Sequence, residues 1–464
     1  MSEAQGWTAR VAGREGPVYR AIADAIGAAM AAGELRPGAR LPTHRALAEA
    51  LGLDLTTVTR AYAEARRRGL LEATVGRGTF IRAEAPPARA AGREAPVDLG
   101  MNLPPLPAEP ALPALLQRGL AALLARPDGA DFLTYRPGAG SAEERAAGAA
   151  WLRPVLGAVA PERVLLSPGA QPALLAVLGV LAGPGDAVLA EALTYPGLRS
   201  AAAQLGIRLV GVAGDAEGML PEAAEAACRE AQPRAICCIP TIQNPTTATM
   251  PEGRRRALAE VARRHGVALL EDDAYGLLPA APLPAVCAFA PEAGFHIATL
   301  SKALSPALRL AVLVLPDAAW AGRVAAALRA NVLMPSPLMA GLLAGWVADG
   351  TAAAVTTAIR RECSARQRIA REVLPDGCFD AHPEGLHLWL RLPPRWGRLG
   401  FAAHLRRQDG LAVVPSDAFA VGPAPEAVRL SLGAAPGREA LRGALRAVAA
   451  ALREEAPAPF SDVV

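Results

Sequence analysis

Six short apolar runs that alternate with helical stretches constrain the fold of residues 98–455 most strongly. The runs comprise residues 164–166, 188–190, 236–239, 268–270, 297–300 and 310–315. Short runs that are apolar at every position are typical of strands buried on both faces, and strands that alternate with helices form a mostly parallel sheet covered by helices. The sequence therefore predicts an α/β domain, in which a smaller α+β lobe begins at about residue 340.

Residues 8–82 follow a different pattern, that of three helices and a two-stranded wing. An i, i+4 apolar series predicts a first helix over residues 17–32, and its members are Val18, Ile22, Ile26 and Met30. Thr43 and Asp54 are positioned to cap the second and third helices. Residues 71–81 contain two strand-like runs around Gly76-Arg77-Gly78, whose glycines allow a tight reversal. This order predicts a winged helix-turn-helix.

Residues 83–97 are rich in Ala, Pro and Arg and have no apolar period, which is typical of a linker. The net charge also divides here. Residues 8–82 hold 12 arginines against 7 acidic residues, which leaves the remainder of this +4 chain near −1. A basic excess confined to one domain indicates a polyanion partner for that domain, and for a winged helix the expected partner is double-stranded DNA.

The 464 residues are 52% hydrophobic, but charges and Gly/Pro breaks interrupt every stretch that could cross a membrane. Residues 1–20 have no apolar signal core, so the sequence predicts a cytoplasmic protein that does not bind membranes. The six cysteines show no C-x-x-C spacing, and we expect them to be reduced core residues rather than metal ligands.

The chain contains a single lysine, Lys302, although Lys and Arg together number 48. Arginine serves wherever positive charge alone is needed, whereas lysine has an amine that can lose its proton and condense with an aldehyde. The plain alternative is that the last lysine fell at this position by chance. The surrounding sequence S-K-A-L-S-P-A-L-R favours a Schiff-base lysine instead.

Pyridoxal phosphate needs an amine, a carboxylate at the pyridine nitrogen, donors to its 3′ oxygen, a phosphate cup and a platform for its ring. Asp272, at the end of one apolar run, is the expected carboxylate, and Asn244 and Tyr275 are expected at the 3′ oxygen. Tyr195 follows another apolar run and can stack on the ring. Lys302 would supply the amine.

The phosphate cup is expected where the run 164–166 meets a helix, because backbone N–H groups at a helix N-terminus attract anions. Its expected members, which include a forked cation and two hydroxyls, are Gly169, Ala170, Gln171, Arg309, Thr299 and Ser301. Each fragment alone has an ordinary explanation, since a strand-end Asp is often a helix cap and a lone Tyr is often packing. Their order along the chain carries the argument.

The succession G-A-Q, T-Y-P-G, Q-N-P-T, D-D-A-Y and S-K-x-L-x-P-x-L-R resembles fold-type I aminotransferases over residues 98–455. The resemblance implies that Lys302 forms the internal aldimine of pyridoxal 5′-phosphate. It also implies that Tyr135 reaches a phosphate across the interface of a homodimer. Arg429 would bind a substrate carboxylate, and the alternative for this residue is a surface ion pair.

Residues 41–81 resemble the GntR-type winged helix. Their motifs L-P-T-H-R-A-L-A and T-V-T-R-A-Y are similar to its usual L-P-S-x-R-x-L-A and T-V-x-x-A-Y. A GntR winged helix joined to an aminotransferase-like domain is the arrangement of the MocR subfamily of bacterial regulators. The resemblance implies that Arg45, Thr57 and Arg60 contact DNA, with Arg77 on the wing.

Five positions depart from these family patterns, and they are Leu55, Glu144, Thr247, Ala307 and Ala311. Thr247 and Ala307 are expected to narrow the space near the cofactor ring, because each has a side chain where glycine is common. Leu55 replaces a frequent arginine, so a base contact at that position is not expected.

Two functions fit the pairing of domains. In the first, a transcriptional regulator senses pyridoxal phosphate or an amino compound through an aldimine at Lys302, and the bound state biases paired DNA-binding domains. In the second, the chain is an active aminotransferase with an amino acid as substrate and the winged helix as an accessory. Both functions need nearly the same cofactor residues, so those residues do not separate them. The fused winged helix favours the regulator.

Overall fold

The computed structural model describes residues 8, 18–32, 34–35, 38–67, 70–74, 78–81, 97–136 and 138–454. The chain divides into two compact units, Met1–Ala95 and Pro96–Val464. Each unit has hydrophobic cores of its own. The predicted linker, residues 83–97, lies outside the described residues except for Val97.

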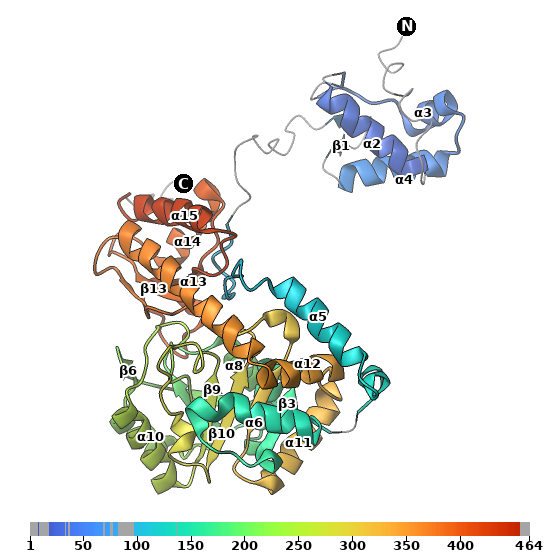
Figure 1. Cartoon of the computed structure of the whole chain (residues 1–464). Coiled ribbons are helices and arrows are strands. Elements are labelled where there is room, and N and C mark those ends of the chain that lie inside the picture. The colour runs from blue at the N-terminus through green and yellow to red at the C-terminus, as the bar shows by residue number, and fades with distance from the viewer. Residues whose placement is uncertain are drawn as a thin grey trace. The chain divides into compact units, whose positions relative to one another are not determined.

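The N-terminal unit has the helices and wing strands that the sequence predicts (Figure 1). They are α2 (Val18–Ala31), α3 (His44–Leu51), α4 (Leu55–Arg67), β1 (Leu71–Thr74) and β2 (Gly78–Ile81). The Thr43 hydroxyl accepts a hydrogen bond from the Ala46 N–H at the start of α3. The Asp54 carboxylate likewise accepts one from the Thr57 N–H at the start of α4. β1 and β2 pair antiparallel, so the predicted winged helix-turn-helix is confirmed.

The larger unit is built on a sheet of seven strands in the order β3-β11-β10-β9-β8-β4-β5. The strands are β3 (Val164–Ser167), β4 (Ala187–Glu191), β5 (Arg208–Val212), β8 (Ala235–Cys238), β9 (Ala268–Asp273), β10 (Gly294–Thr299) and β11 (Ala311–Val314). β11 runs antiparallel to both of its neighbours, and the other adjacent pairs are parallel. The predicted mostly parallel sheet is confirmed, and each of the six apolar runs falls on one of its strands.

Alternate residues of each strand pack on opposite faces of this sheet, as the period of two of a β-strand requires. On β3, Val164 and Leu166 pack against one layer of helices, and Leu165 packs against the other. The first layer contains α6 (Ala142–Leu156), α9 (Pro221–Ala231), α10 (Glu252–His265) and α12 (Pro337–Ala348). The second contains α7 (Ala170–Leu181), α8 (Pro196–Leu205) and α11 (Ala318–Val332). Both faces are buried, which explains why the runs are apolar at every position.

A smaller lobe is built on four antiparallel strands in the order β12-β13-β15-β14. Its elements are β12 (Phe379–Asp380), β13 (His387–Arg391), β14 (Val414–Pro415), β15 (Ala427–Ser431), α14 (Arg398–Asp409) and α15 (Arg438–Ala451). Figure 1 shows the long helix α13 (Thr351–Val373) running from α12 to this lobe. Leu99 belongs to the core of the lobe, so the first residues of the larger unit pack there too.

The small lobe begins later than the residue 340 expected from the sequence. α12 is apolar on nearly all sides, and it packs in the core of the large lobe against α6 and α5 (Leu112–Leu124). The small-lobe core therefore starts within α13, at Ile369 and Ala370. Within the described residues no single helix is long and apolar enough to cross a membrane. The helices α12 and α13 together reach the required length and hydropathy, but the chain bends by 85° between them.

Short elements complete the larger unit. They are η2 (Gly129–Leu133), η3 (Pro161–Arg163), η4 (Val286–Ala288), η5 (Pro306–Leu308), η6 (Ser416–Ala418), β6 (Gly214–Asp215) and β7 (Gly218–Met219). η5 follows Lys302 and presents Arg309 in the left-handed conformation, with φ of 48°. This turn aims the Arg309 guanidinium toward Gly169, at the start of α7.

Candidate cofactor site

A cavity of about 500 Å³ lies beyond the carboxyl ends of the parallel strands, where α/β sheets place their ligand sites. Its lining residues are Met101, Asn102, Leu103, Ala170, Gln171, Tyr195, Pro196, Asn244, Asp272, Ala274, Tyr275, Thr299, Ser301, Lys302, Pro306, Arg309, Val414, Phe419 and Arg429. The predicted cofactor residues all line this cavity except Gly169, which lies behind Arg309, and Tyr135, which lies elsewhere. The predicted substrate residue, Arg429, also lines it.

Lys302 follows β10, and its amine lies in this cavity. Nζ donates a hydrogen bond to the backbone carbonyl of Asn102, 2.5 Å away. Burial lowers the pKa of Lys302 to about 8, the charge of Arg429 acts in the same direction, and the charge of Asp272 opposes both. A lower pKa raises the fraction of neutral amine near neutral pH, and the neutral amine is the form that attacks a carbonyl carbon.

The three carboxylates that end β9 separate by the alternation of the strand. Asp272 faces the cavity, and burial together with the charge of Asp273 raises its pKa to about 7. Glu271 lies on the opposite face, where it accepts a hydrogen bond from the Cys287 N–H at 2.9 Å. Asp273 pairs on that face with buried His296, with 3.2 Å between Oδ2 and Nε2. The choice of Asp272 from the run Glu271-Asp272-Asp273 is thus the one that the strand geometry supports.

The start of α7 has the features of an anion site. Gly169 caps this helix with φ of 108°, and as a glycine it offers no side chain to the first N–H groups of the helix. A Cβ at this position would lie 3.3 Å from Arg309 Nη2, so the missing side chain leaves room for that guanidinium. The hydroxyls of Thr299 and Ser301 lie 3.1 Å apart beside it. Together these groups offer backbone N–H donors, hydroxyls and a forked cation to a phosphate.

Tyr195 is held at the edge of the cavity by a close approach of two chain segments. It is the residue before α8, and Gln171 on α7 donates a hydrogen bond to the carbonyl of Gly197 at 2.9 Å. A Cβ on Gly197 would lie 2.1 Å from Gln171 Oε1 and 2.2 Å from the Tyr195 ring. Only glycine fits at this position, because any side chain would displace both neighbours.

Arg429 lies on β15 of the small lobe and closes the cavity from the other side. Its Nη1 donates a hydrogen bond to Asn244 Oδ1 at 3.0 Å, and its Nη2 donates one to the Gly100 carbonyl. Nε is buried and has no partner among the described residues. The guanidinium stacks 5.1 Å from the centre of the Phe419 ring. This buried cation with an unused N–H is suited to a carboxylate rather than to the surface ion pair considered above.

Sequence reasoning missed two polar residues of this site, Asn102 and His387. The Asn102 amide donates to the Tyr275 hydroxyl at 2.7 Å and lies 3.2 Å from His387 Nδ1. Burial and the charge of Arg429 lower the pKa of His387 to about 3, so this ring is neutral at pH 7. Asn102 and Tyr275 are 173 residues apart in the chain, and no motif surrounds Asn102. The one feature of the sequence that could have indicated Asn102 is that it is a single polar residue between Met101 and Leu103, in a segment that is otherwise apolar.

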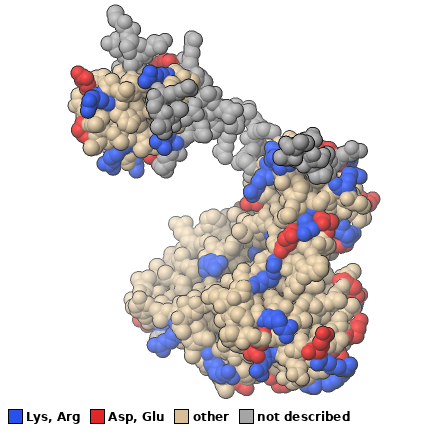
Figure 2. Space-filling model, turned by 180° about the vertical axis from the view of Figure 1, so that it is seen from behind, with Lys and Arg blue, Asp and Glu red and all other residues tan. Residues whose placement is uncertain are grey.

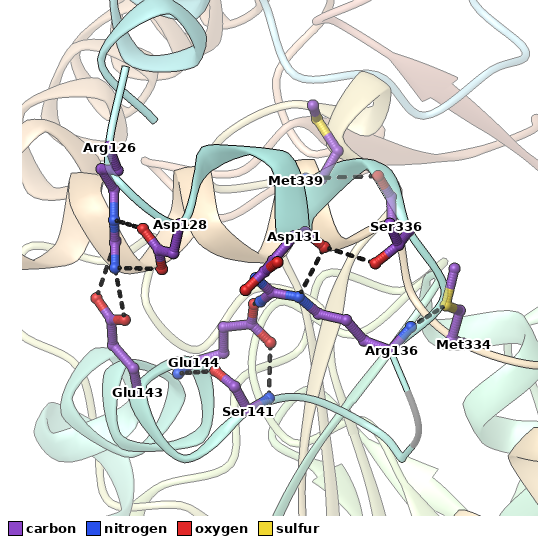
Figure 3. A network of polar contacts seen from close by, with 11 residues as sticks. Arg126, Asp128, Asp131, Arg136, Ser141, Glu143, Glu144, Met334, Ser336 and Met339 are labelled. Carbon is purple, nitrogen blue, oxygen red and sulfur yellow. Dashed lines mark hydrogen bonds and ion pairs between the residues drawn. The ribbon is translucent and has the colours of Figure 1, made fainter. Parts of the chain in front are cut away.

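Tyr135 is not in the cavity of its own subunit, and 80% of its surface is exposed. The neighbouring Arg136 is fixed by several contacts, which Figure 3 shows. Its Nη1 pairs with the buried carboxylate of Glu144 at 3.2 Å, and its guanidinium lies 4.0 Å from the centre of the Phe132 ring. Glu144 also accepts a hydrogen bond from the Ser141 N–H at 2.7 Å, which completes a capping box at the start of α6. Glu144, which stands where leucine is usual in the family, therefore forms an ion pair with Arg136, the residue that follows Tyr135.

The other departures lie outside the cavity. Neither Thr247 nor Ala307 lines it, so the expected narrowing near the ring is not observed. Thr247 has φ of 68°, a left-handed conformation that explains why glycine is common at this position. Ala311 lies in β11 and is fully buried.

The predicted DNA contacts lie on α3 and α4 of the N-terminal unit. Arg45 and Arg60 are exposed, and Arg60 lies 4.6 Å from the centre of the Tyr19 ring. The Thr57 hydroxyl donates to Asp54 at 2.7 Å, and Arg77 lies outside the described residues. Figure 2 shows basic side chains, with some acidic ones between them, on the visible described surface of this unit. Leu55 is 46% exposed at the start of α4.

Comparison with known proteins finds the same two parts. The family Aminotransferase class I and II matches residues 94–448, and the family Bacterial regulatory proteins, gntR family, matches residues 18–81. The uncharacterized HTH-type transcriptional regulator YdeF of Bacillus subtilis is 31% identical over 430 residues, which are 92% of each chain. The chain belongs to the MocR subfamily of GntR-type transcriptional regulators.

Two further proteins are similar to this MocR-type regulator. The vitamin B6 salvage pathway transcriptional repressor PtsJ of Salmonella typhimurium is 28% identical, over 90% of the regulator and 95% of PtsJ. LysN, the α-aminoadipate aminotransferase of Thermus thermophilus, was solved in complex with N-(5′-phosphopyridoxyl)-L-leucine. It superposes with a TM-score of 0.70 at 27% identity, over 77% of the regulator and 92% of LysN.

The cofactor of an aminotransferase domain is pyridoxal 5′-phosphate, and the pocket of this MocR-type regulator fits it on three observations. The start of α7 with Arg309 suits the phosphate, and Asp272 is a buried carboxylate. The amine of Lys302 has a lowered pKa and lies in the same cavity.

Proposed function

We propose that this protein is a pyridoxal-phosphate-dependent transcriptional regulator that binds DNA through its winged helix and responds to pyridoxal phosphate or an amino compound at Lys302. The observation that carries the proposal is that the single lysine lies in a cavity with Asp272 and Arg429, in a chain that also contains a GntR winged helix. Bound pyridoxal phosphate supplies an electrophilic carbon and an electron sink for the amino compound.

Different residues of the cavity would bind different parts of the cofactor and of the amino compound. Asp272 would hold the pyridine nitrogen protonated, and Asn244 and Tyr275 would hold the 3′ oxygen. Tyr195 would stack on the ring. The phosphate would be bound by Gly169, Ala170, Gln171, Thr299, Ser301 and Arg309, and Arg429 would bind the carboxylate of the amino compound.

We infer that the functional unit is a homodimer. Tyr135 is 80% exposed next to Arg136, which pairs with the buried carboxylate of Glu144, so the tyrosine side chain is accessible to a neighbouring subunit. Large apolar side chains are exposed on α5 and on the segments around η2 and after α11, and they are Leu124, Leu133 and Leu333. Figure 2 shows few charges on the left side of the larger unit, which is the side where Figure 1, turned by 180°, places α5. A second copy would cover this surface and complete each phosphate site with the partner's tyrosine.

The DNA would be contacted by Arg45, Thr57 and Arg60 on α3 and α4, and by Arg77 on the wing. The exposure of Arg45 and Arg60 and the basic excess of residues 8–82 support this assignment. A regulator of this kind acts on the chromosome of a bacterium, so we place it in the cytoplasm.

One experiment separates the regulator from an active aminotransferase. The cofactor absorption spectrum is recorded while each amino acid is titrated, and binding to a duplex selected from random sequence is measured in parallel. A regulator changes its DNA affinity when the spectrum changes and does not turn over with a keto acid at ordinary enzyme rates. Steady turnover without sequence-specific DNA binding would identify an aminotransferase. The similarity to YdeF and PtsJ over 90% or more of this chain supports the regulator.

A further inference from the structure

Residues 98–103, here called the leading segment, are the first residues after the predicted linker and also form part of the cofactor cavity. At its start the segment is fixed to the small lobe, because the Leu99 N–H donates to the Ala412 carbonyl at 2.9 Å and the Leu99 carbonyl accepts from the Ser431 N–H at 2.8 Å. Leu99 is fully buried in the small-lobe core. The segment thus runs from the linker directly into the site.

Two backbone carbonyls of the leading segment accept hydrogen bonds from two of the three cationic side chains that line the cavity. The Gly100 carbonyl accepts from Arg429 Nη2, and the Asn102 carbonyl accepts from Lys302 Nζ. These are the same two side chains that the proposed function assigns to the ligand carboxylate and to the cofactor. The leading segment therefore uses donors that ligands would also use.

A ligand carboxylate would compete with Gly100 for Arg429. Nη1 is bonded to Asn244 and Nε has no partner, and both forked modes of carboxylate binding, through Nε with Nη2 or Nη1 with Nη2, use one N–H of Nη2. Nη2 has two N–H groups, so a carboxylate displaces Gly100 in the mode that needs the N–H donated to that carbonyl, and in the other mode it shares Nη2 with it. A carboxylate carries a full charge, whereas the Gly100 carbonyl is neutral, so the carboxylate forms the stronger hydrogen bond. Binding of a carboxylate would weaken the hold of Arg429 on the leading segment.

The hydrogen bond from Lys302 to the Asn102 carbonyl would likewise be weakened when a ligand binds. A protonated amine has three N–H donors, but an amine that has condensed with an aldehyde keeps at most one. The side chain of Asn102 extends the connection, since its amide contacts the Tyr275 hydroxyl and His387 and its Oδ1 accepts from the Ser431 hydroxyl at 3.3 Å. Asn102 therefore ties the leading segment to the 3′-oxygen side of the site and to the small lobe at once.

We propose that the leading segment transmits the state of the cavity to the linker, that Asn102 is a positioning residue in this path, and that the effector is an amino compound with a carboxylate. Free Lys302 and Arg429 hold the segment, and a carboxylate-bearing ligand releases it. This inference rests on the proposed function. It adds the route of regulation and makes the carboxylate, which the proposed function assigns to Arg429, a requirement for an effector.

The test measures DNA affinity of the full-length protein without cofactor, with pyridoxal phosphate alone, and with pyridoxal phosphate plus each of the twenty L-amino acids. The amine that lacks the carboxylate of each active amino acid serves as its matched control. In the wild type we expect at least one amino acid to change DNA affinity about 5- to 150-fold, as allosteric couplings typically do, and its amine to act no more strongly than the cofactor alone. An equal effect of the amine, or no effect of any amino acid beyond the cofactor, would overturn the role of Arg429 and its carboxylate ligand.

Two variants test the path itself. Asn102→Ala removes the side-chain ties, and Leu99→Ala loosens the anchor of the segment outside the cavity. The control is Leu445→Ala on α15, because Leu445 is equally buried in the same core and is not bonded to the leading segment in the described structure. Both leucine variants should lose similar stability, since both create a cavity in one core.

We expect the ligand effect on DNA affinity to fall below about twofold in Asn102→Ala and Leu99→Ala, and to stay near the wild-type value in Leu445→Ala. The absorption of bound cofactor is recorded for every variant, so that loss of cofactor is not mistaken for loss of coupling. A wild-type response in both path variants would reject the leading segment while leaving the proposed function intact. A wild type that binds neither cofactor nor a specific DNA sequence would reject the proposed function, and the inference with it.

Discussion

The guanidinium of Arg136 forms an ion pair with the carboxylate of Glu144, which is 4% exposed. Removing the charge of a buried partner leaves the other group poorly satisfied, so Glu144→Gln should lower the free energy of unfolding by about 1–3 kcal/mol. Glu143→Gln on the same turn is the control. It should cost less than about 0.5 kcal/mol, because Glu143 is 62% exposed in its pair with Arg126. Urea unfolding of both variants checks this, and equal losses would contradict it.

Lys302→Arg and Lys302→Ala should both lack the absorption band of lysine-bound pyridoxal phosphate. Arginine keeps the positive charge but cannot form the covalent bond, so the arginine variant separates charge from chemistry. Spectra of the purified variants after incubation with the cofactor are the measurement. A normal band in either variant would show that Lys302 is not the attachment residue.

The rate of covalent cofactor attachment should rise with pH and level off above a midpoint near 8. Burial and Arg429 lower the pKa of Lys302 to about 8, and the reactive neutral amine is populated above that value. Asp272 raises this pKa, so Asp272→Asn should move the midpoint to lower pH. The rate at which a small free amine reacts with pyridoxal phosphate is measured over the same pH series, so that the pH dependence that comes from the cofactor can be separated from that of Lys302. A midpoint unchanged by Asp272→Asn would contradict the role of this charge.

Arg60→Ala and Arg45→Ala should weaken DNA binding, by roughly 1–3 kcal/mol where the arginine reads a base. An arginine that contacts only phosphate should instead reduce the salt dependence of binding for every sequence. Affinities at several salt concentrations distinguish the two. The control is Arg256→Ala on α10 of the larger unit, where Arg256 pairs with Glu252 at the surface. Equal DNA affinity of the isolated larger unit would refute the assignment.

The DNA site should consist of two half-sites with a restricted spacing. Two tethered winged helices gain affinity only if the linkers allow both to bind, and a flexible linker of 15 residues spans roughly 20 Å in root-mean-square terms. Inserting 5 bp between the half-sites rotates one by about half a turn and should reduce affinity sharply, with partial recovery at about 10 bp. Equal affinity at every spacing, or a monomer that binds cofactor and the full site, would disprove the dimeric arrangement.

The elements that local patterns define were predictable from the sequence. The apolar series from Val18 to Met30 and the caps at Thr43 and Asp54 depend on neighbours within one or two turns, and the structure has them as expected. The selection of Asp272 over its two neighbours also follows from local geometry, because only alternate residues of β9 share a face.

Contacts between distant segments were not predictable. Asn102 meets Lys302, Tyr275 and His387 only after four segments far apart in the chain have packed, and no spacing in the sequence encodes that meeting. α12 was assigned to the wrong lobe for a related reason. An apolar helix can be buried in either core, and its actual partners on α5 and α6 lie some two hundred residues earlier.

The position of Lys302 in the cavity also allows opening of the cavity to be followed by chemistry at one residue. Because Lys302 is the single lysine, reducing a cofactor bound there would leave one modified side chain at a known position. An endoprotease that cuts after lysine would have one site in the unfolded chain, and the partial burial of Lys302 in the cavity would slow cleavage at that site in the native state. One cleavage therefore reports directly on opening of the cavity, without a label and without interference from any other lysine.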